Sequence, residues 1–418
     1  MKVTHFNTFT QGGSAMLMIR LHRALLKDGI ESEVFTRNLA KGGDGIRCLE
    51  YSQNRYRRLV ERAAFSVENR MNRLSAASSY SRMHLPYKTP VPKNNADIIH
   101  LHWISHWLDL PSFVSSLPNK TPIVWTVHDM SALAGGCYTD FGCDQFGKNC
   151  NLCPLLKFPA NHLFARQELK RRRASLSGRK IAFVSNSIST ASLVERSQLT
   201  KDAKHVTILP GFDFSEFQVI SKSEAKMRLG ISDDAFTLGF VAASLTDRNK
   251  GINRFFDVAA KVKKRIPQTQ ALVVGEGIVD VMTEQAVPCS YLGTINDSEM
   301  MNLSYSAMDA LVICSQMESF GQVSVEAQAC GTPVYGFSVG GLPETILQGR
   351  TGVMVPYYEV EVISECIIEG KSSGELLAMG MMGASWVRSQ FDISNMAFRY
   401  MELYRSLLDE EKTGTLAV

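Results

Sequence analysis

The sequence of 418 residues lacks any hydrophobic run approaching the roughly 18 or more apolar residues that a membrane-spanning helix needs. Behind Met1 and Lys2 there is also no apolar stretch of the length found in secretory leaders. These two absences argue against a membrane-spanning or secreted protein. We therefore expect a cytoplasmic protein that is either free or bound at the surface of a membrane.

Cysteine is too scarce for a disulfide-stapled fold, because nine cysteines are spread over 418 residues. Hydrophobic residues make up 45% and charged residues 21%, which is the composition of an ordinary globular protein without long disordered segments. A chain of this length exceeds what one hydrophobic core usually holds. The composition therefore predicts two domains that fold throughout.

Short apolar runs alternate with helical patterns in two series, which is typical of parallel sheets built from βαβ units. The runs are residues 3–9, 33–36, 98–102, 123–128, 181–185 and 206–209, then residues 236–242, 270–274, 290–292, 310–313, 332–336 and 352–355. We expect two doubly wound α/β domains over residues 1–210 and 211–391, with a hinge at 210–217. A further helix at about 392–410 could pack back on the first domain.

The charge is divided unequally between the two halves. Residues 1–210 hold 29 Lys and Arg against 15 Asp and Glu, a net +14, whereas residues 211–418 hold 16 against 26, a net −10. A basic half suits an anionic partner, either a phospholipid surface or nucleic acid, although solvated helix faces would give the same count. Residues 51–93 include six arginines between 55 and 73 among apolar residues, which predicts basic amphipathic helices that lie on a membrane surface. These arginines are Arg55, Arg57, Arg58, Arg62, Arg70 and Arg73; a second basic run is Lys170 to Arg173.

Two loops between a strand and a helix have the composition of phosphate-binding loops. Gly12 and Gly13 follow the first strand and precede a helix, where they either hold a phosphate or form a plain tight turn. The segment from Glu318 to Gln322 opens a second helix that ends at Gly331. Backbone N–H groups at that helix start favour a phosphate, whereas Glu318 and Glu326 suit sugar or ribose hydroxyls. Two solvent-facing glutamates on one helix are the alternative.

This segment closely resembles the Glu-x7-Glu signature of the retaining glycosyltransferase family 4, whose members have the GT-B fold. The resemblance continues in Val273 to Gly277, Leu292-Gly293, Ala310 to Val312, Gly340 to Glu344 and Gly352 to Pro356, in the family's order and spacing. It covers essentially the whole chain and is most specific over residues 236–356. It implies two Rossmann-like domains that face a central cleft, an acceptor-binding domain at 1–210 and a donor-binding domain at 211–391.

The resemblance also implies roles for single residues. Glu326 would bind ribose hydroxyls, Glu318 would face the transferred sugar, and Lys250 resembles the family's diphosphate-binding lysine. Other donor-binding residues implied are Gly12, Gly13, Arg248, Gly275, Gly293, Ser319, Phe320, Gly321 and Gln322. One departure concerns Arg248: family members carry an arginine five residues before the lysine, where this chain has Leu245. Arg248 either supplies that charge from a shifted position or is solvated.

Histidines mark the carboxyl ends of two predicted strands in the first half. His128 ends the run at 123–128, and although a lone histidine there is usually structural, the resemblance places it against the donor sugar as a catalytic residue. His100 and His102 lie on one side of their strand, where a satisfied buried pair is favoured over metal ligands. Asn186 and Ser187 end another strand and are candidates for contact with sugar or acceptor.

Four of the nine cysteines cluster within 17 positions: Cys137, Cys143, Cys150 and Cys153. In a reducing compartment such a cluster favours a structural zinc over disulfides, with free thiols in a packed loop as the alternative. No cofactor is expected for catalysis itself.

The function expected from these features is retaining transfer of a hexose from a nucleotide-diphosphate sugar to a lipid-linked glycan in bacterial surface polysaccharide synthesis. The expected partners are the donor, the glycan acceptor and the anionic inner face of the cytoplasmic membrane, where the enzyme would be peripheral. Nucleic acid is not expected as a partner. The rival functions are a nucleotide-sugar epimerase or phosphorylase of the same fold, and a protein that binds nucleic acid through its basic half.

Overall fold

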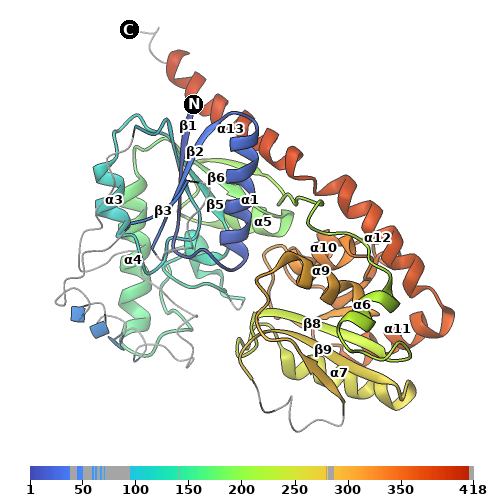
Figure 1. Cartoon of the computed structure of the whole chain (residues 1–418). Coiled ribbons are helices and arrows are strands. Elements are labelled where there is room, and N and C mark those ends of the chain that lie inside the picture. Colours follow the sequence, from blue (N-terminus) through green and yellow to red (C-terminus); the bar gives the residue numbers. More distant parts are fainter. Residues whose placement is uncertain are drawn as a thin grey trace. The chain divides into compact units, whose positions relative to one another are not determined.

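The computed structural model of the chain describes residues 1–37, 45–49, 95–140, 142–278, 280 and 287–413, with seven single positions between 59 and 70. The predicted basic helices at 51–93 lie almost entirely outside the described residues. The chain divides into two compact units, Met1–Gly211 with Ile393–Val418, and Phe212–Asp392 (Figure 1).

The first unit contains a seven-stranded parallel sheet with the strand order β3-β2-β1-β4-β5-β6-β7. Its strands are β1 (Lys2–Asn7), β2 (Glu31–Thr36), β3 (Ile46–Cys48), β4 (Ile98–Leu101), β5 (Ile123–Val127), β6 (Ile181–Ser185) and β7 (Lys204–Thr207). Its helices are α1 (Gly13–Lys27), α3 (Leu110–Ser116), α4 (Ala160–Leu176), α5 (Ile188–Arg196) and α13 (Ile393–Thr413), with short 3-10 helices at Met130–Ala132 and Asp144–Gly147.

The second unit contains a six-stranded parallel sheet with the order β10-β9-β8-β11-β12-β13. Its strands are β8 (Phe236–Ser244), β9 (Thr269–Glu276), β10 (Cys289–Tyr291), β11 (Ala310–Ile313), β12 (Val334–Phe337) and β13 (Gly352–Val355). Its helices are α6 (Lys222–Arg228), α7 (Ile252–Arg265), α9 (Ser298–Ala307), α10 (Gln322–Ala329), α11 (Val360–Ser373) and α12 (Leu376–Gln390), with a 3-10 helix at Leu342–Thr345. The prediction of two parallel α/β sheets is confirmed.

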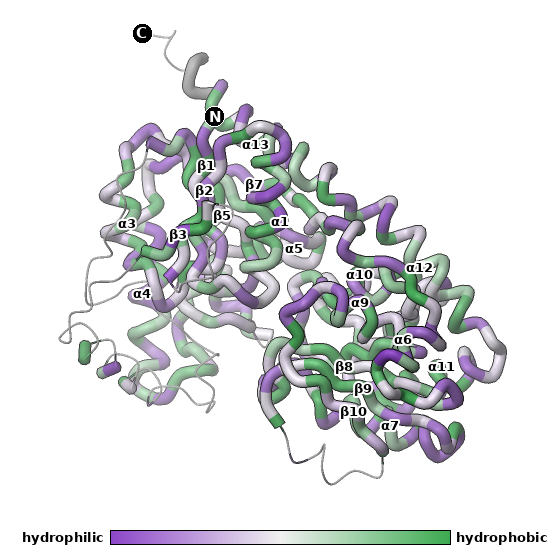
Figure 2. The backbone as a smooth tube through the Cα atoms, viewed as in Figure 1, coloured by the Kyte–Doolittle hydropathy of each residue, from purple (hydrophilic) through white to green (hydrophobic). Residues whose placement is uncertain are grey.

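Continuous apolar runs form these strands because helices cover both faces of each sheet. Strands β8 and β9 accordingly appear mostly hydrophobic in Figure 2. In the first unit one face packs under α1 and α13, where Leu21, Tyr400 and Tyr404 are fully or almost fully buried. The helix expected at 392–410 is α13, and it contacts α1 of the first unit.

One strand was missed by the sequence analysis. β3 is only three residues long, and Ile46-Arg47-Cys48 shows neither an apolar run nor a long alternation. It pairs in parallel with β2 at the edge of the sheet. None of the described helices is long and apolar enough to cross a membrane.

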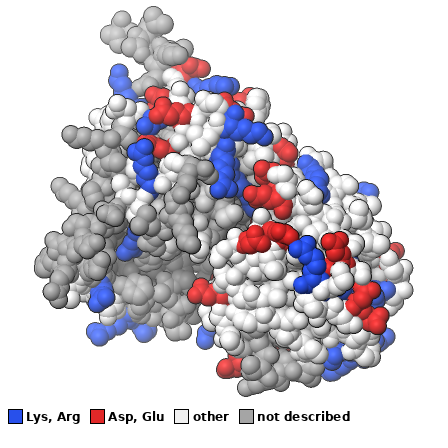
Figure 3. All heavy atoms as spheres, in the orientation of Figure 1, with Lys and Arg blue, Asp and Glu red and all other residues white. Residues whose placement is uncertain are grey.

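Charged side chains are mixed on the face shown in Figure 3, where small groups of Lys and Arg lie beside Asp and Glu. Several of the basic residues are committed to local structure rather than to the surface. Arg172 is 1% exposed and pairs with Glu168 at 3.0 Å on the same helix. The Arg172 charge is therefore internal and balanced by Glu168, and it adds nothing to a basic surface.

Candidate functional site

Each sheet has one pair of neighbouring strands whose connections leave in opposite directions. These pairs are β1 and β4 in the first unit, and β8 and β11 in the second. Open α/β sheets bind ligands in the crevice outside the carboxyl ends of such a pair. Lys250 lies in the loop after β8, and Glu318 lies in the loop after β11.

Lys250 and Glu318 form an ion pair at this position of the second unit. The Lys250 ammonium donates to Oε1 of Glu318 at 2.6 Å, and the Ser315 hydroxyl donates to the same oxygen at 2.7 Å. The two side chains are 30% and 12% exposed. Burial acts to lower the pKa of Lys250, but the charge and hydrogen bond of Glu318 outweigh it, so the pKa is raised above its usual value. The ammonium therefore stays charged.

Asn249 holds the two loops of this ion pair together. Its side-chain amide donates to the carbonyl of Met317 at 3.0 Å, and its side-chain oxygen accepts from the Met317 N–H at 3.0 Å. The Gln316 N–H also donates to the Asn249 carbonyl at 2.8 Å. These bonds fix Lys250 relative to Glu318, and the sequence analysis did not identify Asn249.

A glycine loop touches the backbone of Glu318 from the other side. The Gly341 N–H donates to the Glu318 carbonyl at 2.9 Å. A Cβ on Gly340, where φ is +53°, would lie 1.9 Å from that same oxygen. Only glycine allows the backbone at 340 to lie this close to the Glu318 carbonyl. The loop after β12 therefore fixes the position of the Glu318 backbone.

The start of α10 follows Glu318 directly. Gly321 precedes the helix in the left-handed conformation, with φ of 97°, and no acidic residue occupies the first turn. The first N–H groups of a helix have no partner inside it and attract anions. Farther along, Glu326 accepts a hydrogen bond from the Tyr305 hydroxyl at 2.9 Å. Phe320 is buried and packs edge-on against Phe391, so only its backbone can serve a ligand.

The remaining predicted donor-binding residues lie at the end of β9, after β10, in the loop of Lys250 and at the start of α1. Gly275 at the end of β9 donates its N–H to the Gly293 carbonyl at 2.9 Å. Arg248 is exposed, and its carbonyl lies 3.4 Å from the Gln316 side-chain amide. Gly12 and Gly13 belong to the first unit, where Gly12, with φ of 88°, precedes α1 without a side-chain cap.

His128 follows β5 in the first unit. Its Nε2 lies 3.2 Å from Nδ1 of His102, and burial lowers the pKa of His128 to about 3, so the ring is neutral at physiological pH. The next residue, Asp129, accepts from the Trp103 indole at 2.7 Å and from the Ser131 N–H at 2.8 Å. Burial raises the pKa of Asp129 against these bonds. Asp129 thus anchors the loop that carries His128.

The other polar residues at this edge are part of the fold. His100 is fully buried between the Tyr404 hydroxyl at 2.7 Å and the Thr126 hydroxyl at 2.8 Å, in agreement with a satisfied buried histidine. Ser187 caps α5 by accepting from the Thr190 N–H at 2.9 Å. Asn186 is buried at the end of β6.

Two groups of side chains could hold a metal. Across the described residues, the one set of three or more His, Cys, Asp or Glu with ligand atoms within 4.8 Å of one another is His5, His100 and His102. The four clustered cysteines, all described, do not reach that spacing. They nevertheless line one small cavity of about 20 Å³, and all four are free thiols: Cys137, Cys143, Cys150 and Cys153.

Comparison with known proteins gives the class. Residues 235–370 match the family described as "Glycosyl transferases group 1". The D-inositol 3-phosphate glycosyltransferase of Thermobispora bispora is 24% identical over 418 residues, covering 95% of this chain and 90% of that protein. The enzyme of the same name from Saccharomonospora viridis is 26% identical over 242 residues, 54% of this chain and 55% of that protein.

Solved structures share the fold over nearly the whole chain. Sucrose-phosphate synthase from Thermosynechococcus elongatus has a TM-score of 0.70 at 19% identity, covering 98% of this chain and 100% of that one. Anabaena HepE in complex with UDP-glucose has a TM-score of 0.66 at 16% identity, covering 97% and 100%. WaaG, a glycosyltransferase involved in lipopolysaccharide biosynthesis, has a TM-score of 0.65 at 15% identity, covering 96% and 99%.

The predicted fold class and enzyme class are therefore confirmed. The fold is GT-B, with two parallel α/β sheets. The chain is an enzyme, a group 1 glycosyltransferase, and the group is a retaining one.

The glycine approach predicts the effect of Gly340→Ala. Both Gly340→Ala and the control Gly349→Ala place a side chain at positive φ, +53° and +70°, which costs about 1–2 kcal/mol in either case. Only the Cβ at 340 meets another atom, the carbonyl of Glu318, because nothing lies within 4 Å of the Cβ at 349. We expect Gly340→Ala to lose at least about tenfold more turnover, since misplacing a positioned group is costly. Equal turnover in the two variants would contradict the account.

Proposed function

We propose that the enzyme transfers a hexose from a nucleotide-diphosphate sugar to a hydroxyl of a glycan acceptor, with retention of the anomeric configuration. The observation that carries this proposal is the Lys250–Glu318 ion pair at the β8 and β11 ends, directly before the start of α10. A fixed positive charge and a helix N-terminus suit a diphosphate, and the carboxylates suit hydroxyl groups.

In this proposal the leaving diphosphate lies at Lys250 and at the backbone of Ser319 to Gln322. The ammonium stabilises the negative charge that develops on the diphosphate as the glycosidic bond breaks. Glu326 binds ribose hydroxyls, and Glu318 binds the transferred sugar while it holds Lys250. The further donor contacts are Gly12, Gly13, Arg248, Gly275 and Gly293. The exposure of Arg248 favours a minor, solvated role.

His128 serves the transferred sugar from the first unit, and the acceptor binds that unit. No side chain is assigned as a nucleophile. The departing phosphate accepts the proton of the acceptor hydroxyl, so the new bond forms on the face from which the old one breaks. Catalysis then comes from positioning and from charge stabilisation.

The structure of HepE with UDP-glucose supports a UDP-sugar as the donor. The likeness to WaaG supports an acceptor in a bacterial surface polysaccharide. A nucleotide-sugar epimerase remains the rival within the fold, and the two differ in product. An epimerase releases an altered sugar nucleotide and transfers nothing, so chromatography of the products with and without acceptor separates them.

We also place the enzyme at the cytoplasmic face of the membrane, on an anionic lipid surface. The support is the net +14 of residues 1–210, which includes the six arginines between 55 and 73 and the run Lys170 to Arg173. Each Lys or Arg near an anionic surface contributes about 1 kcal/mol, so a handful gives reversible binding.

For the cysteine loop we propose a structural zinc held by Cys137, Cys143, Cys150 and Cys153. All four line one cavity, and the Gly135 N–H lies 3.3 Å from the Cys150 sulfur, as backbone donors do around thiolates. Binding would draw the sulfurs to about 3.8 Å apart, the spacing that Zn–S bonds of about 2.3 Å require. Burial raises the pKa of Cys150 to about 11, so the zinc would displace the thiol protons.

The two glutamates should fail in different ways. Glu326→Ala is expected to weaken UDP binding about tenfold or more, because a charged hydrogen bond to the ribose is lost. Glu318→Gln should bind UDP nearly normally and lose about 100-fold in kcat, since its contact is to the sugar at the reaction centre. Calorimetry with UDP and steady-state rates check both, with exposed Glu365→Ala as the control. Normal UDP affinity in Glu326→Ala would refute its assignment.

Membrane docking should depend on the arginines between 55 and 73. Sedimentation with liposomes of anionic phospholipid should be strong at low salt and weak at high salt. It should also fall when Arg57, Arg58 and Arg62 become Glu. The control reverses three exposed charges of the second unit, Lys264, Arg265 and Arg350. Docking that survives both the arginine reversal and high salt is not electrostatic, and the proposal would be dropped.

Metal analysis of untagged protein should find about one zinc per chain, from the four-thiolate stoichiometry. Cys150→Ser should lose it, whereas the control Cys366→Ser, in α11, should retain it. A metal-free protein whose four loop thiols all titrate would establish free thiols in a packed loop instead.

A further inference from the structure

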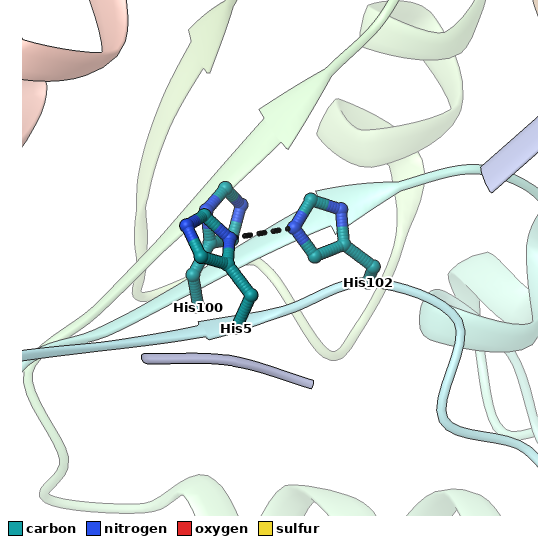
Figure 4. Close-up of side chains that lie close together, drawn as sticks. All are labelled: His5, His100 and His102. Atoms are coloured by element: carbon teal, nitrogen blue, oxygen red, sulfur yellow. Dashed lines mark hydrogen bonds between the residues drawn. The ribbon is translucent and has the colours of Figure 1, made fainter. Parts of the chain in front are cut away.

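Three imidazoles form a continuous hydrogen-bonded chain across the first sheet. Nδ1 of His5 lies 3.1 Å from Nε2 of His102, and Nδ1 of His102 lies 3.2 Å from Nε2 of His128. His5 lies on β1, His102 follows β4 and His128 follows β5, which are three adjacent strands. Figure 4 shows the first of these links. The chain leads from the buried interior to the residue assigned to the sugar.

All three rings are neutral. Burial lowers the pKa of His5 and of His102 well below its usual value, with nearby histidines adding to the effect, and burial lowers the pKa of His128 to about 3. A neutral imidazole has one N–H donor and one bare nitrogen acceptor. His102 uses both nitrogens, so it donates to one neighbour and accepts from the other. The two links must therefore run in the same direction.

The buried end of the chain decides which direction this is. Nε2 of His5 is buried and has no hydrogen-bond partner among the described residues. If the chain runs from His128 toward His5, this atom is an N–H without an acceptor. If it runs from His5 toward His128, the atom is only a bare acceptor. Buried N–H groups without a partner are rarer in proteins than acceptors with an unused lone pair. The second direction is therefore favoured.

We propose that His5 and His102 are positioning residues that hold His128 as the tautomer with its proton on Nδ1. Nε2 of His128 then accepts from His102, and Nδ1 offers one fixed hydrogen-bond donor to an oxygen of the bound sugar. The contact with a sugar rests on the proposed function. The tautomer of His128 does not, because it follows from the hydrogen bonds.

The fixed tautomer limits what His128 can do. With its accepting nitrogen occupied by His102 and its other nitrogen protonated, the ring cannot take the proton of the acceptor hydroxyl. It acts as a neutral donor that orients an oxygen of the sugar. The proton must go elsewhere, which agrees with a departing phosphate as its acceptor.

His100 lies beside the chain but is not part of it. Its ring is 4.1 Å from that of His102, centroid to centroid, and its two nitrogens bond to Tyr404 and Thr126. A metal bound by His5, His100 and His102 needs one nitrogen from each ring, so it would have to replace one of these two bonds and one of the two bonds of His102. The hydrogen-bonded chain keeps them all, so a bound metal is an outcome that the test must separate.

The test is a long-range proton–nitrogen NMR spectrum of the whole protein labelled with ¹⁵N-histidine, at about pH 7, near the usual operating range. His128 is assigned by its loss in His128→Ala. We expect a protonated Nδ1 and a bare Nε2 for His128. A protonated Nε2, or metal bound at His5, His100 and His102 in the same sample, would overturn the proposal, and the wild-type spectrum alone decides between these results.

Two matched variants extend the test. His102→Phe should release His128 from the Nδ1–H form, whereas His100→Phe, equally buried and two residues earlier, should leave that form unchanged.

His128→Ala should lower kcat/KM at least about tenfold, as loss of one hydrogen bond to substrate does. Full activity in His128→Ala, together with a wild-type spectrum that shows the Nδ1–H form, would refute the contact with the sugar but leave the proposed tautomer in place. The two failures are thus distinguishable.

Discussion

The ion pair of Lys250 and Glu318 is the interaction around which the second unit's candidate site is organised. It joins the segments that follow β8 and β11, the two neighbouring strands whose connections leave in opposite directions. Taking two charges largely out of water is expensive, and a pair of this kind is weak evidence for stability alone. Asn249, Ser315 and Gly341 all bond to this region. The fold thus maintains a costly charged arrangement where a diphosphate would be received.

At the corresponding edge of its sheet, the first unit buries neutral polar groups instead of an ion pair. Its buried groups are neutral imidazoles and hydroxyls that are linked by hydrogen bonds, from Tyr400 and Tyr404 on α13 through Thr126 and His100. A low-dielectric interior strengthens such a network when its members are satisfied. The C-terminal helix therefore covers the sheet and also fixes His100 and Thr126, each one residue before the end of its strand, β4 or β5. Because α13 packs on this unit, its two tyrosines hold the polar side chains at this edge of the sheet.

Much of this arrangement could be predicted from the sequence. Twelve of the thirteen described strands were anticipated as apolar runs that overlap their observed bounds, although the run for β7 was displaced by two residues. The neighbourhood of Lys250 and Glu318 also followed, because carboxyl ends of parallel strands share one edge. Asn249 was missed, and the contact of Gly340 was not foreseen although its motif was noted, because both residues contact backbone atoms of a distant loop. His5 was hidden within an apolar strand, and its link to His102 depends on the pairing of β1 with β4, which spacing does not reveal.

The most direct test of the donor-site account is a crystal structure of the protein with UDP. The account predicts the diphosphate at the first turn of α10, within reach of the Lys250 ammonium, and ribose hydroxyls bonded to the Glu326 carboxylate. The second unit offers an alternative, an open polar cavity of about 630 Å³ that is lined by Lys222, Lys226 and Lys371. UDP bound in that cavity, with the loops of Lys250 and Glu318 empty, would contradict the account.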